Sequence, residues 1–303
     1  MSAATIDNIY GAPSEDFVGA HEGARQFSPL APGASRLEEI SPATLSSFAM
    51  LAPPGTAERR HALALALRAL APGASLIVHA MKDKGGSRLA GDLQKLGCAF
   101  DETSKRHHRI CATRGAGDAE AIAAAIADGE PRFLEEIGLW SQPGIFSWDR
   151  IDPGSALLLE NLPKLSGRGA DFGCGLGVLA RAVLASPKVA HLTLVDIDRR
   201  AVDMARRNID DSRVDLKWAD VRTLDLAGLD FIVMNPPFHD GGFEDKSLGQ
   251  KFIQRAAAAL RSGGTLWLTA NRHLPYEEVL KPLFKRVTPI ASERGYKIYQ
   301  VVK

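Results

Sequence analysis

The sequence predicts an α/β protein of two tandem domains, each a mainly parallel sheet covered by helices. In the second half, apolar runs typical of strands alternate with runs of helical spacing. A glycine-rich turn joins the first of these strands to a helix, and three blocks of the first half align in order with three blocks of the second. The 303 residues, 45% of them hydrophobic, suffice for two domains of about 100 to 200 residues each.

The second half opens with a strand, a glycine loop and a helix. The loop lies in residues 169–177, GADFGCGLG, and residues 178–184 have the apolar spacing of a helix. Glycines let the backbone turn sharply and approach a ligand closely. Their spacing lacks the GxGxxG fingerprint of pyrophosphate binding, which makes NAD the weaker interpretation. The residues predicted to bind a cofactor here are Asp171, Gly173, Gly175 and Gly177.

Acidic residues follow the next two predicted strands. Strand 191–195 ends at Asp196, where a carboxylate can accept hydrogen bonds from ribose hydroxyls. The alternative for Asp196 is the N-cap of the following helix, a role for which Asp198 competes. Asp220 follows strand 214–218 and could accept a hydrogen bond from an adenine amino group, or be an ordinary exposed loop carboxylate.

The apolar run 231–234 ends in the tetrapeptide Asn235-Pro236-Pro237-Phe238. An Asn side-chain oxygen beside a backbone carbonyl can accept both hydrogens of an exocyclic amino group, and the Phe ring offers a planar substrate a stacking surface. Such acceptors lower a reaction barrier by orientation and electrostatics. The alternative is a strand that ends in a rigid proline turn. We predict that Asn235, Pro236 and Phe238 are catalytic and that Asn235 also borders the cofactor.

Together these motifs resemble the class I S-adenosylmethionine-dependent methyltransferases, in the branch that acts on amino groups. The resemblance implies a Rossmann-like, seven-stranded sheet with S-adenosyl-L-methionine across the carboxyl ends of its strands. It also implies direct methyl transfer to an amino nitrogen without a metal. The remaining elements follow in order, as a helix at 251–260, a strand at 265–269, a helix at 275–284 and a strand at 296–302.

Four stretches carry a closer likeness, namely residues 146–159, 169–177, 235–241 and 270–276. They are similar to the bacterial ribosomal RNA guanine-N2 methyltransferases that act on the small subunit. This implies that the substrate is the exocyclic N2 of a guanine in ribosomal RNA, either as RNA or in a small-subunit ribosomal particle. It also implies that the loop in 146–159 is a lid over the methionine part of the cofactor, although a simple domain-entry loop fits the sequence equally.

The first half carries a weaker copy of the second. Residues 48–55 align without a gap with residues 231–238, so that Ala52 stands at the position of Asn235. Three aligned blocks in one order indicate an internal duplication. The copy lacks the Asn, the Phe and a glycine loop, and we therefore expect it to bind no cofactor. The other two blocks are 70–80 with 260–270 and 104–110 with 292–298.

The boundary between the domains is predicted after the helical run 118–128. Residues 1–130 are expected to form a degenerate methyltransferase-like domain that recognises RNA or supports the catalytic half, with a loosely ordered start of about 30 residues. Residues 131–303 are expected to form the catalytic domain. The basic run 104–109 is a candidate contact to the RNA backbone, although a solvated surface segment is the more usual explanation.

Composition limits the other possibilities. A net charge of +1 argues against a strongly basic nucleic-acid binder but does not exclude RNA. The three cysteines form no CxxC pair, so neither a disulfide nor a zinc site is expected. The run 61–81 is interrupted by charged and turn residues, and the chain opens without an apolar leader. We expect a cytoplasmic, monomeric protein without a membrane segment.

Other functions use similar motifs. The same tetrapeptide serves adenine-N6 methylation of nucleic acid and glutamine-amide methylation of protein. The paired first half and residues 271–276 favour the guanine-N2 family over both. A non-catalytic RNA-binding factor for ribosome assembly could also use this scaffold, but the intact glycine loop and Asn235 argue against that reading.

Overall fold

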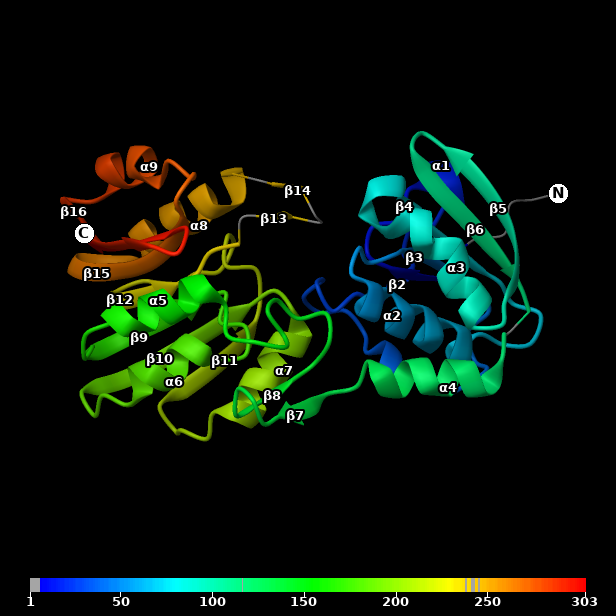
Figure 1. Cartoon of the computed structure of the whole chain (residues 1–303), viewed down its shortest axis with the longest axis horizontal. Helices are drawn as coiled ribbons and strands as arrows, with labels where there is room; N and C mark the ends of the chain where they lie inside the picture. Colours follow the sequence, from blue (N-terminus) through cyan, green and yellow to red (C-terminus); the bar gives the residue numbers. More distant parts are fainter. Residues whose placement is uncertain (1–5, 116, 238, 241–242, 245) are drawn as a thin grey trace. The chain divides into compact units, whose positions relative to one another are not determined.

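The computed structural model describes residues 6–115, 117–237, 239–240, 243–244 and 246–303. The chain divides into two compact units, Met1–Glu130 (unit 1) and Pro131–Lys303 (unit 2), and each has its own sheet and hydrophobic core (Figure 1). No helix in the described ranges is long and apolar enough to cross a membrane.

Unit 2 is built on a seven-stranded sheet in the order β11-β10-β9-β12-β15-β17-β16. Only β17 runs antiparallel to its neighbours, β15 and β16. The carboxyl ends of the parallel strands therefore lie at one edge of the sheet. The strands are β9 (Gly167–Phe172), β10 (Val189–Asp196), β11 (Val214–Trp218), β12 (Leu229–Met234), β15 (Leu260–Asn271), β16 (Arg286–Glu293) and β17 (Tyr296–Val302).

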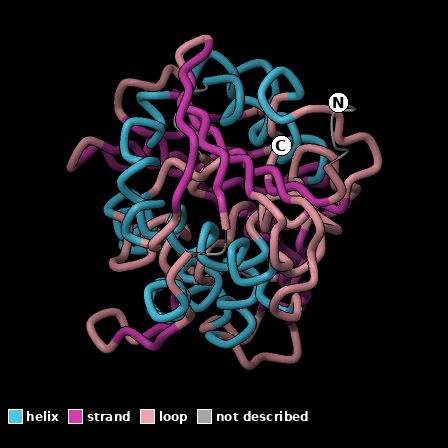
Figure 2. Tube along the Cα trace, turned by 90° about the vertical axis from the view of Figure 1, so that its right-hand side faces the viewer, coloured by secondary structure: helices cyan, strands magenta, loops and turns pink. Residues whose placement is uncertain are grey.

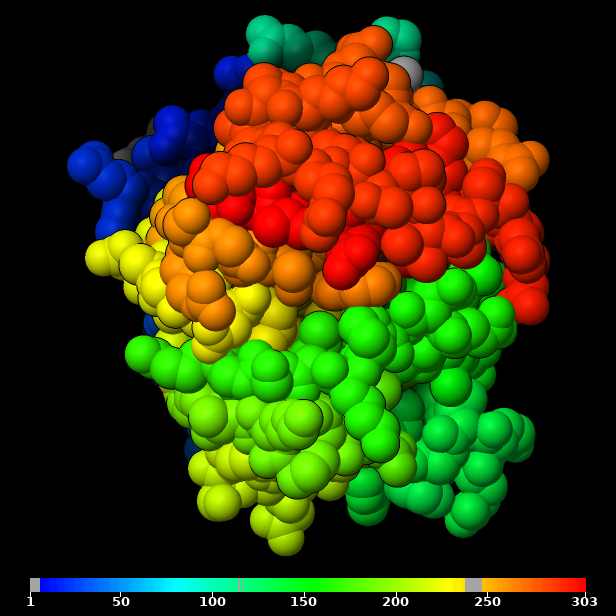
Figure 3. Space-filling model, turned by 90° about the vertical axis from the view of Figure 1, so that its left-hand side faces the viewer, coloured from blue at the N-terminus to red at the C-terminus, as the bar shows by residue number. Residues whose placement is uncertain are grey.

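Helices cover both faces of this sheet. Successive side chains of a strand point to opposite faces, so one strand contributes to the core on each side. In β12, Ile232 and Met234 pack into a core with α8 and α9, while Phe231 and Val233 pack into another with α5 and α6. In Figure 3 the C-terminal segments, orange to red, lie beside green segments that include α5, which contacts β15, β16 and β17. The helices are α5 (Pro153–Asn161), α6 (Val178–Leu184), α7 (Arg199–Asn208), α8 (Lys246–Ala259) and α9 (Tyr276–Leu283).

The elements predicted for the second half are confirmed, with some different bounds. The helix expected at 251–260 begins earlier, at Lys246, and the strand expected at 265–269 extends over the whole of β15. Residues 261–264 belong to neither of the expected elements. In the structure, β15 keeps its pairing with β12 through a register shift, in which Leu229 pairs with Leu260 and Phe231 with Thr265.

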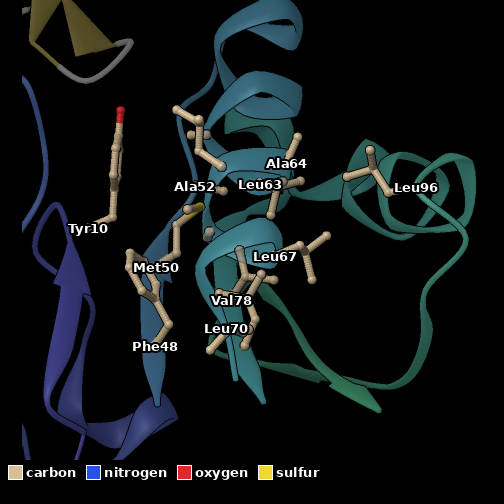
Figure 4. Packing of buried hydrophobic residues seen from close by; sticks show 14 of the residues in the cluster. Tyr10, Phe48, Met50, Ala52, Leu63, Ala64, Leu67, Leu70, Val78 and Leu96 are labelled. Atoms are coloured by element: carbon tan, nitrogen blue, oxygen red, sulfur yellow. The ribbon is translucent and has the colours of Figure 1, made fainter. Parts of the chain in front are cut away.

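Unit 1 has a six-stranded sheet in the order β2-β1-β3-β4-β6-β5, in which only β6 is antiparallel to its neighbours. Side chains of β3 and α2, among them Phe48, Met50, Leu63 and Leu67, fill the core between strand and helix (Figure 4). The elements are β1 (Asn8–Tyr10), α1 (Glu15–Val18), β2 (Arg25–Gln26), β3 (Phe48–Leu51), α2 (Thr56–Ala69), β4 (Leu76–Met81), α3 (Ser87–Lys95), β5 (Ala99–Lys105), β6 (His108–Arg114) and α4 (Ala119–Asp128).

The two sheets share one strand order, except that the described residues of unit 1 form no counterpart of the edge strand β11. In that order β3 takes the place of β12, β4 that of β15, and the hairpin β5–β6 that of β16–β17 (Figure 2 shows β5 and β6 joined by a tight turn). Both hairpins turn through two residues with positive φ, Arg106 and His107 in unit 1 and Arg294 and Gly295 in unit 2. The aligned sequence blocks thus occupy equivalent places in the two sheets.

The expectation of a loosely ordered start is wrong for the residues described from Ile6 onward. β1 and β2 belong to the sheet, and Ile6, Tyr10 and Val18 are buried. The glycines of this segment suggested disorder, but they mark turns between short elements. Gly11, for example, has a φ of 74°, which glycine adopts without strain.

The remaining elements are short. In the sequence, β7 (Arg132–Leu134) and β8 (Leu139–Ser141) follow unit 1 and form a hairpin. β13 (His239–Asp240) pairs with β14 (Phe243–Glu244). Short helical turns cover Leu37–Glu39 and Lys82–Gly86.

Candidate active site

A cavity lies at the carboxyl edge of the sheet in unit 2. It is lined by the glycine loop that follows β9, the segment that leads into α5, and Asn235, which follows β12. β9 and β12 are neighbours, with Phe172 paired to Met234, so their carboxyl ends meet. The sheet thereby brings together two motifs that are far apart in the sequence.

The three glycines of the loop have different roles. All have positive φ, at 78° for Gly173, 51° for Gly175 and 83° for Gly177. Gly173 and Gly175 line the cavity, and a Cβ atom at Gly175 would meet nothing within 4 Å. Gly177 does not line the cavity; a Cβ there would lie 2.6 Å from Cδ1 of Ile209. Gly177 is therefore needed for packing at the start of α6, while the other two leave backbone open to a ligand.

A buried carboxyl group stands behind the loop. Asp171 is fully buried, and neither of its oxygens has a hydrogen-bond partner among the described residues. Burial, and then the neighbouring Asp196, raise the pKa of Asp171 to about 8; the nearby backbone N–H of Ala180 offsets this only in part. Buried polar atoms without partners are rare. A cationic or hydrogen-bonding group on a ligand would give these oxygens a partner.

Asp196 holds the glycine loop in place. Its carboxylate accepts hydrogen bonds from the backbone N–H of Gly175 at 2.8 Å and of Asp198 at 2.9 Å. Burial raises its pKa to about 6, and these two bonds oppose the rise. Asp198, not Asp196, caps α7 by accepting from the N–H of Arg200, so the capping alternative for Asp196 does not hold.

Asp220, like Asp171 and Asp196, is not among the residues that line the cavity, and its carboxylate is already engaged. Arg222 donates to it from Nε and Nη2, at 2.9 and 2.6 Å, and its backbone N–H donates as well, at 2.8 Å. Together with burial, which opposes them, these contacts leave the pKa of Asp220 below its ordinary value. The structure favours the loop carboxylate over the adenine ligand.

The side-chain amide of Asn235 has a defined orientation. Its Nδ2 donates to Oδ2 of Asp152 at 2.8 Å and to Oγ of Ser155 at 2.9 Å. A carboxylate oxygen only accepts hydrogen bonds, so the nitrogen must face Asp152. The carbonyl oxygen of the amide accepts no hydrogen bond from any residue that the structure describes. It is the group available to a ligand in the cavity that Asn235 lines.

The rest of the tetrapeptide is described in part. Pro236 is buried directly after Asn235. The predicted stacking residue, Phe238, lies outside the described residues. Two large apolar side chains, Phe146 and Ile151, line the cavity while remaining 62% and 39% exposed.

The sequence gives no indication that Asp152 and Ser155 are partners of Asn235. Asp152 followed by Pro153 has the pattern of a helix N-cap, and the carboxylate does cap α5 through the N–H of Ser155. That local pattern predicts where the helix begins. It gives no sign of a contact to a residue 83 positions away.

The fold of this chain is similar to that of known methyltransferases. The family "Methyltransferase small domain" matches residues 136–300. A solved structure titled as the 16S rRNA N2 G1207 methyltransferase of T. thermophilus, in complex with AdoMet and guanosine, has a TM-score of 0.72 and 25% identity, and the match covers 95% of this chain and 78% of that one. Fold and site define a class I methyltransferase.

The named relatives indicate a narrower family within this class. "Ribosomal RNA small subunit methyltransferase C" of Shewanella loihica is 33% identical over 267 residues, which cover 84% of this chain and 77% of the relative. The protein of the same name from Pseudomonas paraeruginosa is 32% identical, over 96% of this chain and 92% of the relative. This chain belongs to the ribosomal RNA small subunit methyltransferase C family.

Proposed function

We propose that this protein transfers a methyl group from S-adenosyl-L-methionine to the exocyclic N2 of a guanine in ribosomal RNA of the small subunit. Family membership supports the reaction class and the cofactor. The observation that carries the proposal is the amide of Asn235, whose nitrogen is held away from the cavity so that its oxygen is left to accept from an amino group.

The residues around the glycine loop fit the cofactor. Asp171 has two unpartnered oxygens for the ammonium of the methionine part, Asp196 has carboxylate oxygens for the ribose hydroxyls, and Gly173 and Gly175 allow close approach of the backbone. When bound, the cofactor supplies an electrophilic methyl group on a sulfonium.

The chain's own residues prepare the amino nitrogen for transfer. Its lone pair is delocalised into the base, so the nitrogen is a poor nucleophile. Oδ1 of Asn235 and the carbonyl of Pro236 would accept its two hydrogens and direct the lone pair at the methyl group. Moving a base out of its stack costs a few kcal/mol, which stacking on Phe238 would offset in part. The proton is lost after transfer, when the nitrogen is acidic, so no strong base is required.

We also propose that unit 1 is a degenerate methyltransferase-like domain that arose by duplication. Its sheet order supports this, and so does the turn that aligns with the catalytic tetrapeptide. Nη1 of the buried Arg59 donates to the carbonyls of Pro53 and Pro54, at 3.2 and 2.8 Å. Pro53 aligns with Pro236, so a guanidinium of the same chain occupies the acceptor that a substrate would use.

Unit 1 would then act as a support for unit 2 or as an RNA contact through the exposed, basic turn of the hairpin β5–β6. Its basic residues are not all available to a phosphate, because Arg106 pairs with Asp16 and Arg109 pairs with Glu102. Ribosomal RNA, or a small-subunit ribosomal particle, is the proposed partner of a monomeric protein in the cytoplasm, the compartment where this substrate is found.

The proposed reaction can be tested directly. Small-subunit ribosomal RNA and particles from cells that lack the gene would be incubated with the purified protein and isotopically labelled S-adenosylmethionine. Mass spectrometry of the digested nucleosides is expected to show N2-methylguanosine. Labelled N6-methyladenosine, or labelled glutamine in protein, would instead identify one of the two alternative enzymes. Absence of any cofactor binding would favour a non-catalytic assembly factor.

Replacement of Asp196 with alanine is expected to weaken cofactor binding by about tenfold or more, the scale of a lost hydrogen bond to a charged group. The variant removes the proposed ribose acceptor and also the carboxylate that fixes the N–H of Gly175. Calorimetric titration with S-adenosylmethionine measures the change. The exposed Asp210→Ala is the matched control and should bind as the native protein does. An unchanged affinity in Asp196→Ala would reject the ribose role.

Cofactor affinity is expected to rise with pH. In the free protein the raised pKa of Asp171, about 8, keeps this carboxyl protonated at lower pH, whereas an ammonium favours the carboxylate. Binding should therefore release a proton below about pH 8, and the affinity should increase with pH up to that value, by at most about tenfold per pH unit. Calorimetry in buffers of different ionisation enthalpy measures both the affinity and the proton.

The same group contributes to the pH dependence of stability. The folded pKa of Asp171 lies above its ordinary value of 3.8, so its contribution to stability is fully present below that value and is lost as pH rises through about 8. Asp171→Asn should therefore stabilise the cofactor-free protein above about pH 8 while weakening cofactor binding. A pH-independent cofactor affinity in the native protein would contradict the assignment.

A further inference from the structure

We infer that Asp152 and Ser155 are positioning residues for the methyl transfer, because they fix the amide of Asn235 with its oxygen towards the substrate. This inference rests on the proposed function and names two residues that act through Asn235. Both line the same cavity as Asn235, and both contact the same nitrogen, at 2.8 and 2.9 Å.

An Asn side chain needs such a constraint, because its two ends are almost equal in shape and opposite in hydrogen bonding. With the amide rotated by half a turn, Nδ2 would face the substrate amino group, and donor would meet donor. The rotated amide would also place its oxygen against the carboxylate of Asp152, acceptor against acceptor. Asp152 thus favours the productive orientation by attraction and disfavours the other by repulsion.

Asp152 is itself held in place. Its Oδ2 also accepts from the backbone N–H of Ser155 at 2.9 Å, as the N-cap of α5. A Cβ atom at Gly154 would lie 2.7 Å from the ring of Tyr296 and 3.0 Å from Oδ2 of Asp152, so the ring of Tyr296 and the helix start enclose the carboxylate closely. Asp152 therefore links the first turn of α5 to the amide of Asn235.

Ser155 completes the contact. The two hydrogens of Nδ2 have two acceptors, the carboxylate of Asp152 and the hydroxyl oxygen of Ser155. With both hydrogens engaged, the plane of the amide is fixed as well as its direction. A preorganised acceptor requires no rearrangement during the reaction, which is the condition under which such groups contribute most.

Three variants test the inference in the full-length protein, namely Asp152→Ala, Asp152→Asn and Ser155→Ala. The measurements are the single-turnover methylation rate, the KM for RNA, the Kd for S-adenosylmethionine and the melting temperature. Asp152→Ala is expected to slow single turnover about a hundredfold, the scale of a misplaced reacting group, with the Kd for the cofactor little changed. Ser155→Ala, which keeps one of the two acceptors, should lose about tenfold.

Asp152→Asn is the conservative variant, since its carbonyl oxygen can still cap α5 and still accept from Asn235. We expect it to restore the rate to within about fivefold of the native protein. Asp118→Ala is the matched control for a lost cap. Asp118 accepts the N–H of Ala121 at 2.8 Å at the start of α4, in unit 1. Asp118→Ala should change the melting temperature about as much as Asp152→Ala does, and it should leave the single-turnover rate unaltered.

A readout that is independent of activity separates this inference from the proposed function. Hydrogen exchange of the side-chain NH2 of Asn235, followed by NMR, should be slow in the native protein and faster in Ser155→Ala and Asp152→Ala. Fast exchange in the native protein, or a native single-turnover rate in Asp152→Ala, would overturn the inference. So would an Asp152→Asn variant as slow as Asp152→Ala, because charge and not orientation would then be the cause.

If Asp152→Ala does not fold, Asp152→Asn and Ser155→Ala decide the question. Failure of the native protein to methylate guanine N2 would instead remove the proposed function.

Discussion

Asn235→Ala is expected to lower turnover about a hundredfold or more while S-adenosylmethionine still binds. The variant deletes the oxygen proposed to accept an amino hydrogen in the transition state, and removal of one preorganised group of this kind costs about 2.7 to 4 kcal/mol. The loop residues Gly173 and Gly175 are unchanged in this variant. The carboxyl groups of Asp171 and Asp196 are also unchanged. Steady-state and single-turnover rates with ribosomal RNA, together with calorimetric titration of the cofactor, measure the two effects separately.

Asn161→Ala provides the control. Asn161 is also partly buried in unit 2, and its Nδ2 donates to the carbonyl of Leu157 at 2.9 Å within α5. It should lose some stability and keep its turnover. Near-native turnover in Asn235→Ala would remove Asn235 from the catalytic residues, and so would equal losses in the two variants.

Arg59→Ala is expected to destabilise unit 1 by about 3 to 5 kcal/mol. The buried guanidinium pairs with Asp92 at 2.7 Å and donates to the carbonyls of Pro53 and Pro54. Its removal leaves a carboxylate that is only 2% exposed and deprives both carbonyls of a donor. Urea unfolding, followed by far-UV circular dichroism, measures the loss in the free energy of unfolding.

Arg60 offers a comparison on the same carboxylate. Its Nε also lies 2.7 Å from Asp92, but its side chain is 40% exposed. An exposed ion pair contributes at most about 1 kcal/mol, so Arg60→Ala should have a much smaller effect. Equal losses for Arg59→Ala and Arg60→Ala would show that the contacts to the proline carbonyls contribute little.

Local patterns predicted most of the fold and part of the site. The strand, glycine loop and helix around Gly175 are encoded by adjacent residues, and the helix expected after Asp196 is present as α7 (Arg199–Asn208). The order of the strands brings Gly175 and Asn235 to one cavity, as the family resemblance implied. Sequence could not distinguish Gly177 from the other loop glycines, because its need for glycine comes from Ile209, on another element.

Other features depend on side-chain pairing that the sequence does not single out, or on burial that is unusual for the residue type. Asp220 was predicted as a ligand from its place after a strand, yet the nearby Arg222 occupies its carboxylate. The alignment predicted that unit 1 binds no cofactor, because it lacks the Asn, the Phe and a glycine loop. It did not predict that Arg59 donates to the carbonyls of the aligned proline turn, since an arginine on a helix is seldom fully buried.

The guanidinium of Arg59 and the carboxyl of Asp171 should make the stability of the two units depend differently on the supply of a small molecule. In unit 1, Arg59 is paired with acceptors of its own chain, and we expect the stability of this unit not to depend on the cofactor. In unit 2, the oxygens of Asp171 accept no hydrogen bond from a described side chain, and a ligand that pairs with them should stabilise the fold in proportion to the logarithm of its concentration. When cells are starved of the methyl donor, unit 2 should be the first to become accessible to proteases.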